Sequence, residues 1–370
     1  MQKKNILLKP YFFNMKLAEG AYAGAERYGL ALSLAQPSYF ESTSPWKKYD
    51  GILTPSIKSA SWRKELQKDG CKVICLSLLG EKDLLEEADA IVASDESQVC
   101  MEGATYFHHK GFSNFACCLD RKREMLLRSQ LQKIGIENIY SFAPSTSKIA
   151  VDLESRIEFI RKLPKPCAFI VQTVLWTERW NEVIQRSGVK VPEELSILGI
   201  DNYEYICNVQ SPRLSAIDTN SYELGFRAVE TMAKLLNGEA VPHQTLIAPK
   251  KRVVERESSN FYAVSNKKLQ QIIAFIRAHI GEGLTVRLLA EEFSVTVQAL
   301  DSLFLRHLWI SPKRFLIEQQ LMRAEELLRH GDLKIAEVAR ESGFMTQKSF
   351  YDFFKEYHNT SPKEWCCRRW

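Results

Sequence analysis

Long apolar runs are missing from this chain of 370 residues, although hydrophobic residues make up 45% of its sequence. No stretch approaches the roughly 18 consecutive apolar residues that a helix needs to cross a bilayer. The opening residues 1–8 hold two lysines and a short apolar run that Lys9 and Pro10 end, which is too little for the core of a signal peptide. We therefore expect a cytoplasmic protein with no membrane partner.

The nine cysteines lack the spacing of a functional cysteine site. Adjacent pairs occur at 117–118 and 366–367, but no C-x-x-C motif does, so neither a disulfide framework nor a zinc site is predicted. Glycine-rich phosphate loops and the strained serine turn of hydrolases are missing as well. The sequence therefore predicts reduced thiols, no metal, no cofactor and no enzymatic activity.

Charge of one sign is also scarce. The chain carries 50 lysines and arginines against 45 aspartates and glutamates, which gives a net charge of +5 at neutral pH. A charge of this size permits binding to nucleic acid without indicating it, because basic residues gathered on one face matter more than the total.

What the sequence does contain is one supersecondary unit that occurs twice, at 284–307 and 333–357. Each copy predicts a short helix with a small alanine on its inner face, a tight turn, and a second helix that begins after a threonine able to cap its amide groups. This is the order of a helix-turn-helix motif. The alanines are Ala290 and Ala339, and the threonines are Thr296 and Thr346.

A long helix is predicted between the two copies. A Ser-Pro pair follows each copy, at 311–312 and 361–362, and proline favours the first position of a helix, where an amide hydrogen would have no partner. Residues 312–329 would span about 27 Å. Two recognition helices held apart in this way fit successive major grooves, which repeat at about 34 Å. The alternative, a helical bundle that does not bind DNA, does not account for the tandem repeat.

The stretch from 267 to 370 carries several short motifs, which are Ala-Glu-Glu-Leu-Leu at 324–328, Ile-Ala-Glu-Val-Ala at 335–339, Gly-Phe at 343–344, Ser-Phe at 349–350, Phe-Phe-Lys at 353–355 and Ser-Pro-Lys-Glu-Trp at 361–365. With these motifs it resembles the AraC-type family of bacterial transcription regulators. Trp309 and Asn359 stand where that family usually has glycine, and Ser302 and Asp352 stand where it often has a basic residue. The resemblance implies a domain that binds duplex DNA at two adjacent major-groove half-sites.

Residues 5–256 show a different pattern, in which short apolar runs alternate with amphipathic segments of helical length. Such alternation predicts parallel sheets covered by helices on both faces, and the length favours two lobes. The fold class expected for the chain is therefore a two-lobed α/β domain followed by an all-α domain. The candidate strands are 5–8, 51–54, 72–76, 90–93, 114–118, 138–142, 167–171 and 196–200.

The segments 188–202, 211–218, 222–225 and 235–238 resemble the sensor domain of LacI-type repressors and the type I periplasmic sugar-binding proteins. The resemblance implies a sugar clamp of two lobes between which the chain crosses three times. It implies that 214–217 leads back to the first lobe, that 221–236 is the last helix of that lobe, and that 245–256 returns to the second. The predicted division is a sensor at 1–257, a linker at 258–266 and a DNA-binding domain at 267–370.

Effector-binding residues are expected beyond the carboxyl ends of the parallel strands. Asp201 and Arg123 match the family's ligand-contacting aspartate and arginine, although Asp201 could instead cap a turn and Arg123 could lie on the surface. Further candidates are Asn14, Asp95, Thr173 and Trp176, with Asp95 equally suited to cap its own helix.

The effector itself is expected, from the resemblance, to be a monosaccharide such as xylose. Val174 stands where the family commonly has an aspartate, so a non-sugar metabolite, or a domain that serves only for dimerisation, is the alternative.

The recognition helices offer several side chains to base edges. Glutamine can pair with adenine, lysine with guanine, and aspartate with the amino group of cytosine. Basic residues toward helix ends are expected to contact phosphate, which orients the protein without selecting sequence. The groove-facing candidates are Gln298, Asp301, Ser302, Thr346, Gln347, Lys348, Tyr351 and Asp352, and the phosphate-contacting candidates are Arg306, Lys313, Arg314 and Lys355.

The sequence as a whole predicts a transcription regulator controlled by a small-molecule effector. Its expected partners are duplex DNA, the effector, a second copy bound through the sensor domain, and RNA polymerase if it activates. A DNA-modifying enzyme and a sugar transport receptor are the rival classes. The first lacks a catalytic motif, and the second does not explain the tandem motifs.

Overall fold

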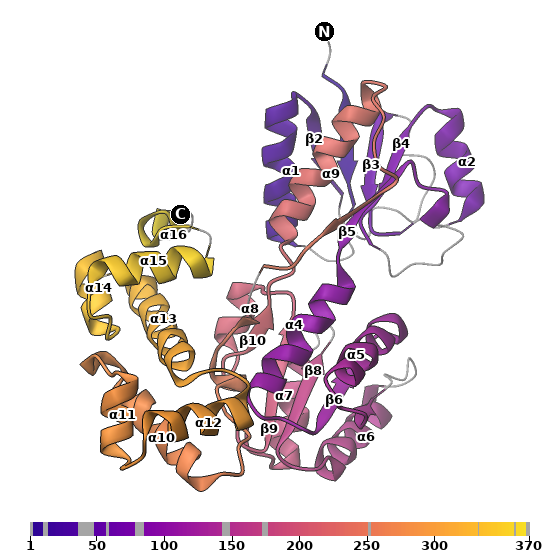
Figure 1. The fold of residues 1–370 in the computed structure, drawn as a ribbon. Helices are drawn as coiled ribbons and strands as arrows, with labels where there is room; N and C mark the ends of the chain where they lie inside the picture. The colour runs from indigo at the N-terminus through magenta and orange to yellow at the C-terminus, as the bar shows by residue number, and fades with distance from the viewer. Residues whose placement is uncertain are drawn as a thin grey trace.

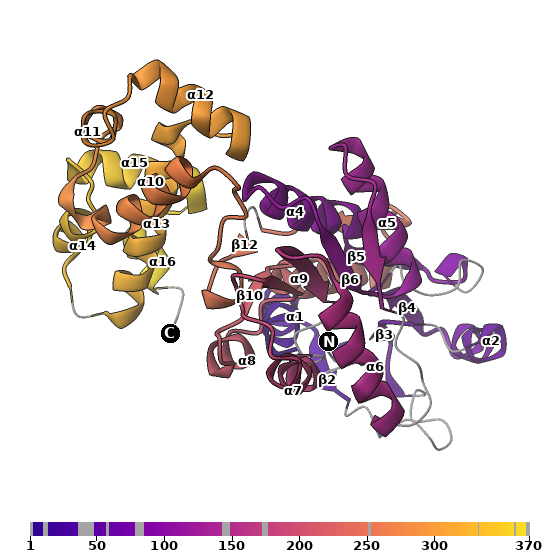
Figure 2. The ribbon, with the colours of Figure 1, turned by 90° about the horizontal axis from the view of Figure 1, so that it is seen from below.

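The computed structural model describes residues 3–9, 14–35, 48–56, 59–77, 85–142, 149–171, 177–250, 253–331, 333–358 and 360–367. Two α/β lobes form one domain, and a helical domain lies beside the second lobe (Figures 1 and 2). The predicted fold class is confirmed. None of the helices in the described part of the chain has the length and apolar character of a membrane span.

The first lobe is built on a parallel sheet with the strand order β11-β5-β4-β3-β1-β2. Helices α1 (Met15–Tyr28) and α9 (Ser221–Leu236) pack together on one face, and α2 (Ala60–Lys68) covers the other. The strands are β1 (Asn5–Leu8), β2 (Ala31–Leu34), β3 (Gly51–Thr54), β4 (Lys72–Cys75), β5 (Ala90–Ser94) and β11 (Gln244–Ile247).

The second lobe repeats this plan with the order β12-β10-β9-β8-β6-β7, in which only the β10–β12 pair is antiparallel among the described strands. One face carries α4 (Glu96–His109) and α5 (Arg121–Lys133), and the other α6 (Ile149–Lys162) and α7 (Thr177–Ser187). The strands are β6 (Phe115–Cys118), β7 (Ile139–Ser141), β8 (Cys167–Val171), β9 (Leu195–Ile200), β10 (Ser215–Ile217) and β12 (Val253–Val254).

The chain passes between the lobes after β5, after β10 and after β11, as predicted. The segment β11 to β12 joins an edge strand of the first sheet to an edge strand of the second. Closure of one lobe on the other therefore bends three neighbouring segments rather than a single hinge.

The helical domain contains both predicted motifs. In the first motif, Thr296 caps α12 by accepting a hydrogen bond from the amide of Ala299 at 3.1 Å. Ser311 caps the long helix α13 in the same way, with Pro312 at its first position. The helices are α10 (Lys267–Ala278), α11 (Val286–Glu292), α12 (Val297–Leu308), α13 (Pro312–His330), α14 (Ile335–Glu341), α15 (Gln347–His358) and α16 (Pro362–Cys367).

Helix α13 belongs to the cores of both motifs. Its first turn contributes Phe315 and Leu316 to the core that holds α10, α11 and α12. Its later turns contribute Leu321, Ala324 and Leu328 to the core that holds α14 and α15. Because the same rigid helix is buried in both cores, the two motifs are held at a fixed separation.

Gly343 lies at the contact between the two halves of the helical domain. It adopts a left-handed φ of 82°, and a Cβ there would lie 2.0 Å from the carbonyl oxygen of Ile280. Its own carbonyl oxygen accepts a hydrogen bond from Gln320 at 2.7 Å.

We expect Gly343→Ala to destabilise the chain by clearly more than the roughly 1–2 kcal/mol that a left-handed backbone costs a non-glycine residue. Gly331→Ala is the matched control, because Gly331 has a φ of 77° but nothing within 4 Å of its Cβ position. Chemical denaturation of both variants would separate backbone strain from the clash, and equal losses would contradict this account of the contact.

Candidate effector site and DNA interface

Arg123 lies at the start of α5, in the second lobe. Asp120 caps that helix by accepting hydrogen bonds from the amides of Lys122 and Arg123. The Arg123 guanidinium donates to both carboxylate oxygens of Glu96, at 2.6 and 2.8 Å, and the residue is only 7% exposed. Arg123 is therefore not a surface residue, and a two-point bond of this kind fixes the plane of its guanidinium.

Asp201 follows β9 directly and adopts a left-handed backbone, with a φ of 73°. Its Oδ1 accepts a hydrogen bond from the Thr219 hydroxyl at 2.5 Å. Burial raises the pKa of the Asp201 carboxyl, and the positive charge of Arg123 opposes that rise. The arrangement places a hydrogen-bond acceptor beside a fixed donor fork, which are the two groups that recognition of neighbouring hydroxyls requires.

Asn14 and Asp95 both cap helices. Asn14 accepts from the amide of Leu17 at the start of α1, and its side-chain amide donates to the Ser221 hydroxyl at 3.1 Å. Asp95 accepts from the backbone and side chain of Gln98 at the start of α4. Their roles toward an effector stay predictions. Thr173, Val174 and Trp176 lie outside the described residues.

Three further polar residues of the site were missed by the sequence reasoning. Glu96 holds Arg123, while Thr219 and Ser221 join Asp201 to Asn14 through hydroxyl contacts. Thr219 follows the stretch 214–217 that was predicted to lead back to the first lobe, and Ser221 begins the helix predicted at 221–236, so their position beside a crossing was a usable signal. Glu96 gave none, because its pairing depends on how α4 packs against α5.

A cluster of opposite charges bridges the lobes on the side of the crossing segments. Lys16 of α1 lies 3.4 Å from Glu204 of α8 (Glu204–Val209) and 3.7 Å from Asp218. Lys250 approaches Asp218 from the third crossing segment, at 3.5 Å. Although burial raises the pKa of Asp218, the two lysines lower it below its usual range. The Asp218 carboxylate, in the second crossing segment, thus ties helix α1 of the first lobe to the third crossing segment.

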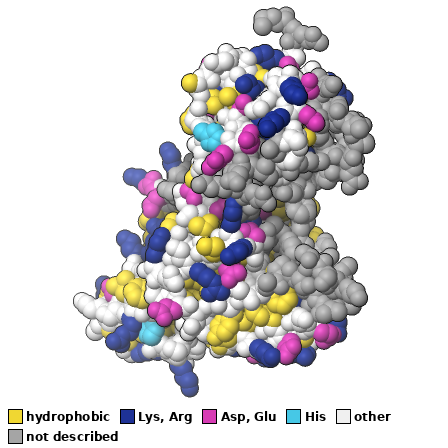
Figure 3. Space-filling view, turned by 90° about the vertical axis from the view of Figure 1, so that its right-hand side faces the viewer, with side chains coloured by type: hydrophobic (Ala, Val, Ile, Leu, Met, Phe, Trp, Pro, Cys, Tyr) yellow, Lys and Arg dark blue, Asp and Glu magenta, His cyan; other side chains and the backbone are white. Residues whose placement is uncertain are grey.

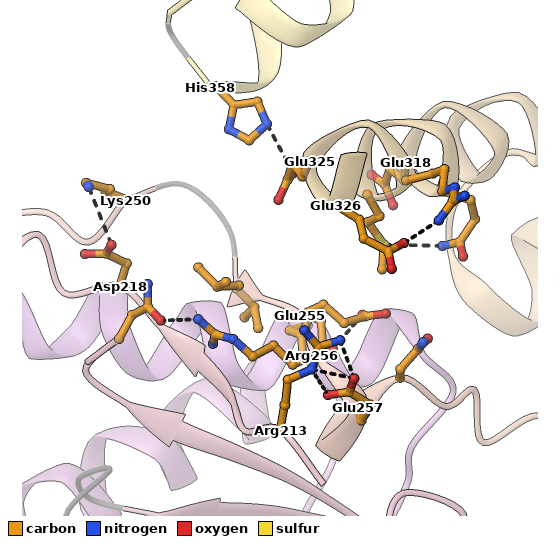
Figure 4. Close-up of a pocket in the computed structure, with 18 of the residues that line it drawn as sticks. Arg213, Asp218, Lys250, Glu255, Arg256, Glu257, Glu318, Glu325, Glu326 and His358 are labelled. Carbon is orange, nitrogen blue, oxygen red and sulfur yellow. Dashed lines mark hydrogen bonds and ion pairs between the residues drawn. The ribbon is translucent and has the colours of Figure 1, made fainter. Parts of the chain in front are cut away.

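A polar cleft of about 1860 Å³ separates the crossing segments from the helical domain (Figure 4). Its wall on the two-lobed domain carries Arg213, which is paired with Glu257. Its wall on α13 carries several carboxylates, including Glu325, which lies 3.2 Å from His358 of α15. Arg123 and Asp201 do not line this cleft, so it is distinct from the candidate effector site.

The two domains meet at the end of α4. Lys110, which is 3% exposed, lies 2.6 Å from the Glu255 carboxylate. The Tyr106 hydroxyl donates to the same carboxylate at 2.6 Å and contacts the hydroxyl of Ser259. Burial lowers the pKa of Lys110 and raises that of Tyr106. Helix α4 therefore begins at Glu96, beside Arg123, and ends in this buried network.

The predicted linker is embedded between the domains. Ser258 accepts from the amide of Ser215 and donates to the carbonyl of Ile197, so it is tied to the second sheet. Tyr262 lies below the Lys110 ammonium, 4.1 Å from it, and 5.1 Å from the ring of Phe315 in α13. A linker held at both ends transmits a displacement rather than absorbing it.

Trp309, at the end of α12, contacts the two-lobed domain directly. Its indole stacks on His108 of α4 with ring centroids 5.2 Å apart and planes 25° from parallel. Trp309 has a left-handed φ of 61° and remains 60% exposed. Trp309 is strained in this backbone conformation because it has a Cβ, whereas glycine adopts the same conformation without strain. The stack on His108 compensates for the strain.

We expect Trp309→Gly to leave the overall stability nearly unchanged. Loss of the stack costs about 0.5–1.5 kcal/mol, and relief of the backbone returns about 1–2 kcal/mol. Trp309→Ala removes only the stack and should be the less stable variant. Each variant is then combined with His108→Ala in a double-mutant cycle measured by thermal denaturation. His108→Ala should destabilise the parent chain and have little effect once the indole is removed. Additive effects would contradict the contact.

The recognition helices expose most of the predicted groove-facing side chains. On α12, Gln298 and Ser302 are exposed, and Asp301 is half-buried. On α15, Gln347, Lys348 and Asp352 are exposed. The other two predicted groove-facing residues are Thr346, which caps α15, and Tyr351, which is half-buried.

Among the predicted phosphate contacts, Arg306, Lys313 and Lys355 are exposed. Arg314 instead pairs with Glu318 at 3.1 Å and with Glu356 of α15 at 3.3 Å. It therefore also fastens α13 to α15. The described part of the face turned away from the helical domain carries charges of both signs rather than a basic patch (Figure 3).

Two family models match the chain. Residues 104–259 match a periplasmic binding protein-like domain, and residues 289–368 match a helix-turn-helix domain. The xylose operon regulatory protein of Escherichia coli strain K12 is 26% identical over 208 residues, which are 56% of this chain and 53% of that protein. The transcriptional activator RhaS of Salmonella schwarzengrund is 28% identical over 138 residues, which are 37% of this chain and 50% of that protein. The chain thus spans about half the length of the curated relatives it matches.

Solved structures show the same fold. The structure of the xylose-binding transcription activator xylR covers 99% of this chain and 98% of its own, with a TM-score of 0.60 and 19% identity. A LacI family regulator from Enterococcus faecium with bound ribose covers 69% of this chain and 98% of its own, with a TM-score of 0.57 and 16% identity. The chain therefore shares the fold of these structures, and its segment that matches a periplasmic binding protein-like domain precedes the segment that matches a helix-turn-helix domain.

Proposed function

We propose that this chain is a transcription regulator that binds DNA through its two helix-turn-helix motifs under the control of a monosaccharide, with xylose as the first candidate. The observation that carries the proposal is helix α13, which is shared by two cores and holds two exposed recognition helices apart. A carbohydrate-utilisation operon is the proposed target, because relatives that match this chain include a xylose operon regulatory protein. Access to chromosomal DNA requires a cytoplasmic location.

The proposed control runs from the candidate effector site at Arg123 and Asp201 along α4. An effector bound at Arg123 and Asp201 would either displace the Glu96 carboxylate from Arg123 or bind to it alongside Arg123, at the start of that helix. A helix of 14 residues spans about 21 Å and moves as a rigid rod, so a shift at Glu96 displaces Lys110 and His108 at its other end. The effector can shift the equilibrium between lobe arrangements only by binding one arrangement more tightly than the other.

The partners in the proposal are duplex DNA, the effector and a second copy of the chain bound through the two-lobed domain. RNA polymerase joins them if the protein activates. Equilibrium sedimentation with and without sugar tests the dimer. A chain that stays monomeric at all concentrations would restrict the proposal to one chain reading both half-sites.

Footprinting of the full chain on duplexes selected from a random library tests the DNA-binding function. The expected pattern is protection of two successive major-groove segments on one face, with affinity that falls steeply as salt rises. Thermal denaturation against a panel of pentoses, hexoses and unrelated metabolites tests the effector. Protection of a single groove, or of none, would overturn the proposed reading of DNA.

A further inference from the structure

The two recognition helices expose different chemistry. On α12 the exposed face is formed by Gln298, Ala299, Ser302, Leu305 and Arg306, while Leu300, Phe304 and Leu308 are buried. Leu305 is 50% exposed and lies seven residues, about two helical turns, after Gln298, so the two share one line with Ser302. A large apolar side chain therefore lies on the same line as two groove-facing candidates, one turn beyond Ser302.

The corresponding face of α15 is charged. Lys348, Asp352 and Lys355 are exposed along one side of the helix, at spacings of four and three residues. Within the described chain, none of these side chains makes an ion pair, in contrast to Arg314, which is held by two glutamates. Gln347 at the start of the helix is exposed as well.

Each of these surfaces fits a different base pair. Leucine and alanine contact the C5-methyl group of thymine, and glutamine pairs with adenine. Lysine donates to O6 and N7 of guanine, and aspartate accepts from the amino group of cytosine. Ala299 and Leu305 cannot form hydrogen bonds with a guanine or cytosine edge through their side chains, so placing them there would leave polar base atoms without partners.

We propose that α12 reads a half-site dominated by A·T pairs, through thymine methyl groups against Leu305, and that α15 reads a half-site containing G·C pairs, through Lys348 and Asp352. This inference rests on the proposed DNA-binding function and deepens it. The recognition sequence is then two unlike half-sites, one for each motif, rather than a repeat of one sequence within a single chain.

The test uses the full chain and duplexes selected from a random library. In one series, deoxyuridine replaces thymidine in each half-site in turn, which removes only the C5-methyl group. In the other, 7-deazaguanine replaces guanine, which removes only the N7 acceptor. We expect deoxyuridine to weaken binding about fourfold per contacted methyl group in one half-site alone, and 7-deazaguanine to weaken binding about tenfold in the other.

Variants assign each half-site to a helix. Leu305→Ala should abolish the deoxyuridine effect at the thymine that Leu305 contacts, because the shorter side chain no longer reaches that methyl group, and Lys348→Met should abolish the 7-deazaguanine effect. Leu288→Ala is the matched control, because Leu288 is 48% exposed on α11 rather than on a recognition helix. Leu288→Ala should leave both base effects unchanged.

The outcomes separate the two proposals. Two protected half-sites of the same composition, or a deoxyuridine effect that persists in Leu305→Ala, would overturn this inference and leave the proposed function standing. Absence of any sequence-dependent footprint would overturn the proposed function itself.

Discussion

Asp201→Asn is expected to shift the response to effector to much higher concentrations while DNA binding without effector persists. The substitution keeps an oxygen that can accept from Thr219, but it removes the negative charge beside Arg123. A hydrogen bond to a charged group contributes about 1.5–3 kcal/mol, so effector affinity should fall by roughly 10-fold to 100-fold. Because burial already disfavours the charged carboxyl, the variant should fold at least as stably as the parent chain.

Thermal denaturation with and without effector, together with DNA binding in both conditions, measures the two expectations. Asp69→Asn serves as the control, because Asp69 is an exposed aspartate at the end of α2. If Asp201→Asn is stabilised by the same sugar as the parent chain and to the same extent, the effector site lies elsewhere.

Lys110→Met should produce the largest loss of stability. The change leaves the Glu255 carboxylate buried at the junction of the two domains without its positive partner. Breaking a buried ion pair on one side costs about 3–5 kcal/mol. Adding Glu255→Gln should recover most of the loss, since a neutral side chain needs no counter-charge and can still accept from Tyr106.

Chemical denaturation of the single and double variants tests this expectation. Lys72→Met is the matched control: its ion pair with Asp89 is partly exposed, at 3.4 Å, and exposed pairs contribute at most about 1 kcal/mol. Equal losses for Lys110→Met and Lys72→Met would show that the junction does not depend on its buried charge. Lys110→Met should also weaken control of DNA binding by effector, because Lys110 ends the path that begins at Glu96, whereas Lys72→Met should leave that control unchanged.

The sequence predicted most of the fold because most strands are central and fully buried, so each shows an uninterrupted apolar run. The bounds of β1, β3 and β8 agree with the prediction. Strands β2, β10, β11 and β12 were not among the predicted strands. Three of them lie at sheet edges, where one neighbour is absent and burial is only partial, and β10 is buried but has only three residues. Two residues of β12 are too few to give a periodic pattern.

The site was predictable to a smaller extent. Resemblance indicated Arg123 and Asp201, and the structure pairs Arg123 with Glu96 and Asp201 with Thr219. The Glu96 contact joins two helices whose packing no local pattern encodes. Leu305 gave no signal either, since an apolar residue on an amphipathic helix is expected to be buried, and only its exposure reveals another role.

Trp309 illustrates both what the sequence could predict and what it could not. The sequence marked it as unusual, because it occupies a position where glycine is expected in the AraC-type pattern. Its partner His108 lies in another domain, about 200 residues earlier in the chain. No spacing rule connects two residues so far apart.

The burial of α13 in both cores has a consequence for the operator. Such a helix cannot stretch, so under the proposed function the two motifs would accept only one distance between half-sites. Each inserted base pair turns the following groove by about 34°, and an insertion of about five places it on the opposite side of the duplex. Phase along the DNA, as much as base sequence, would then decide which promoters this chain can serve.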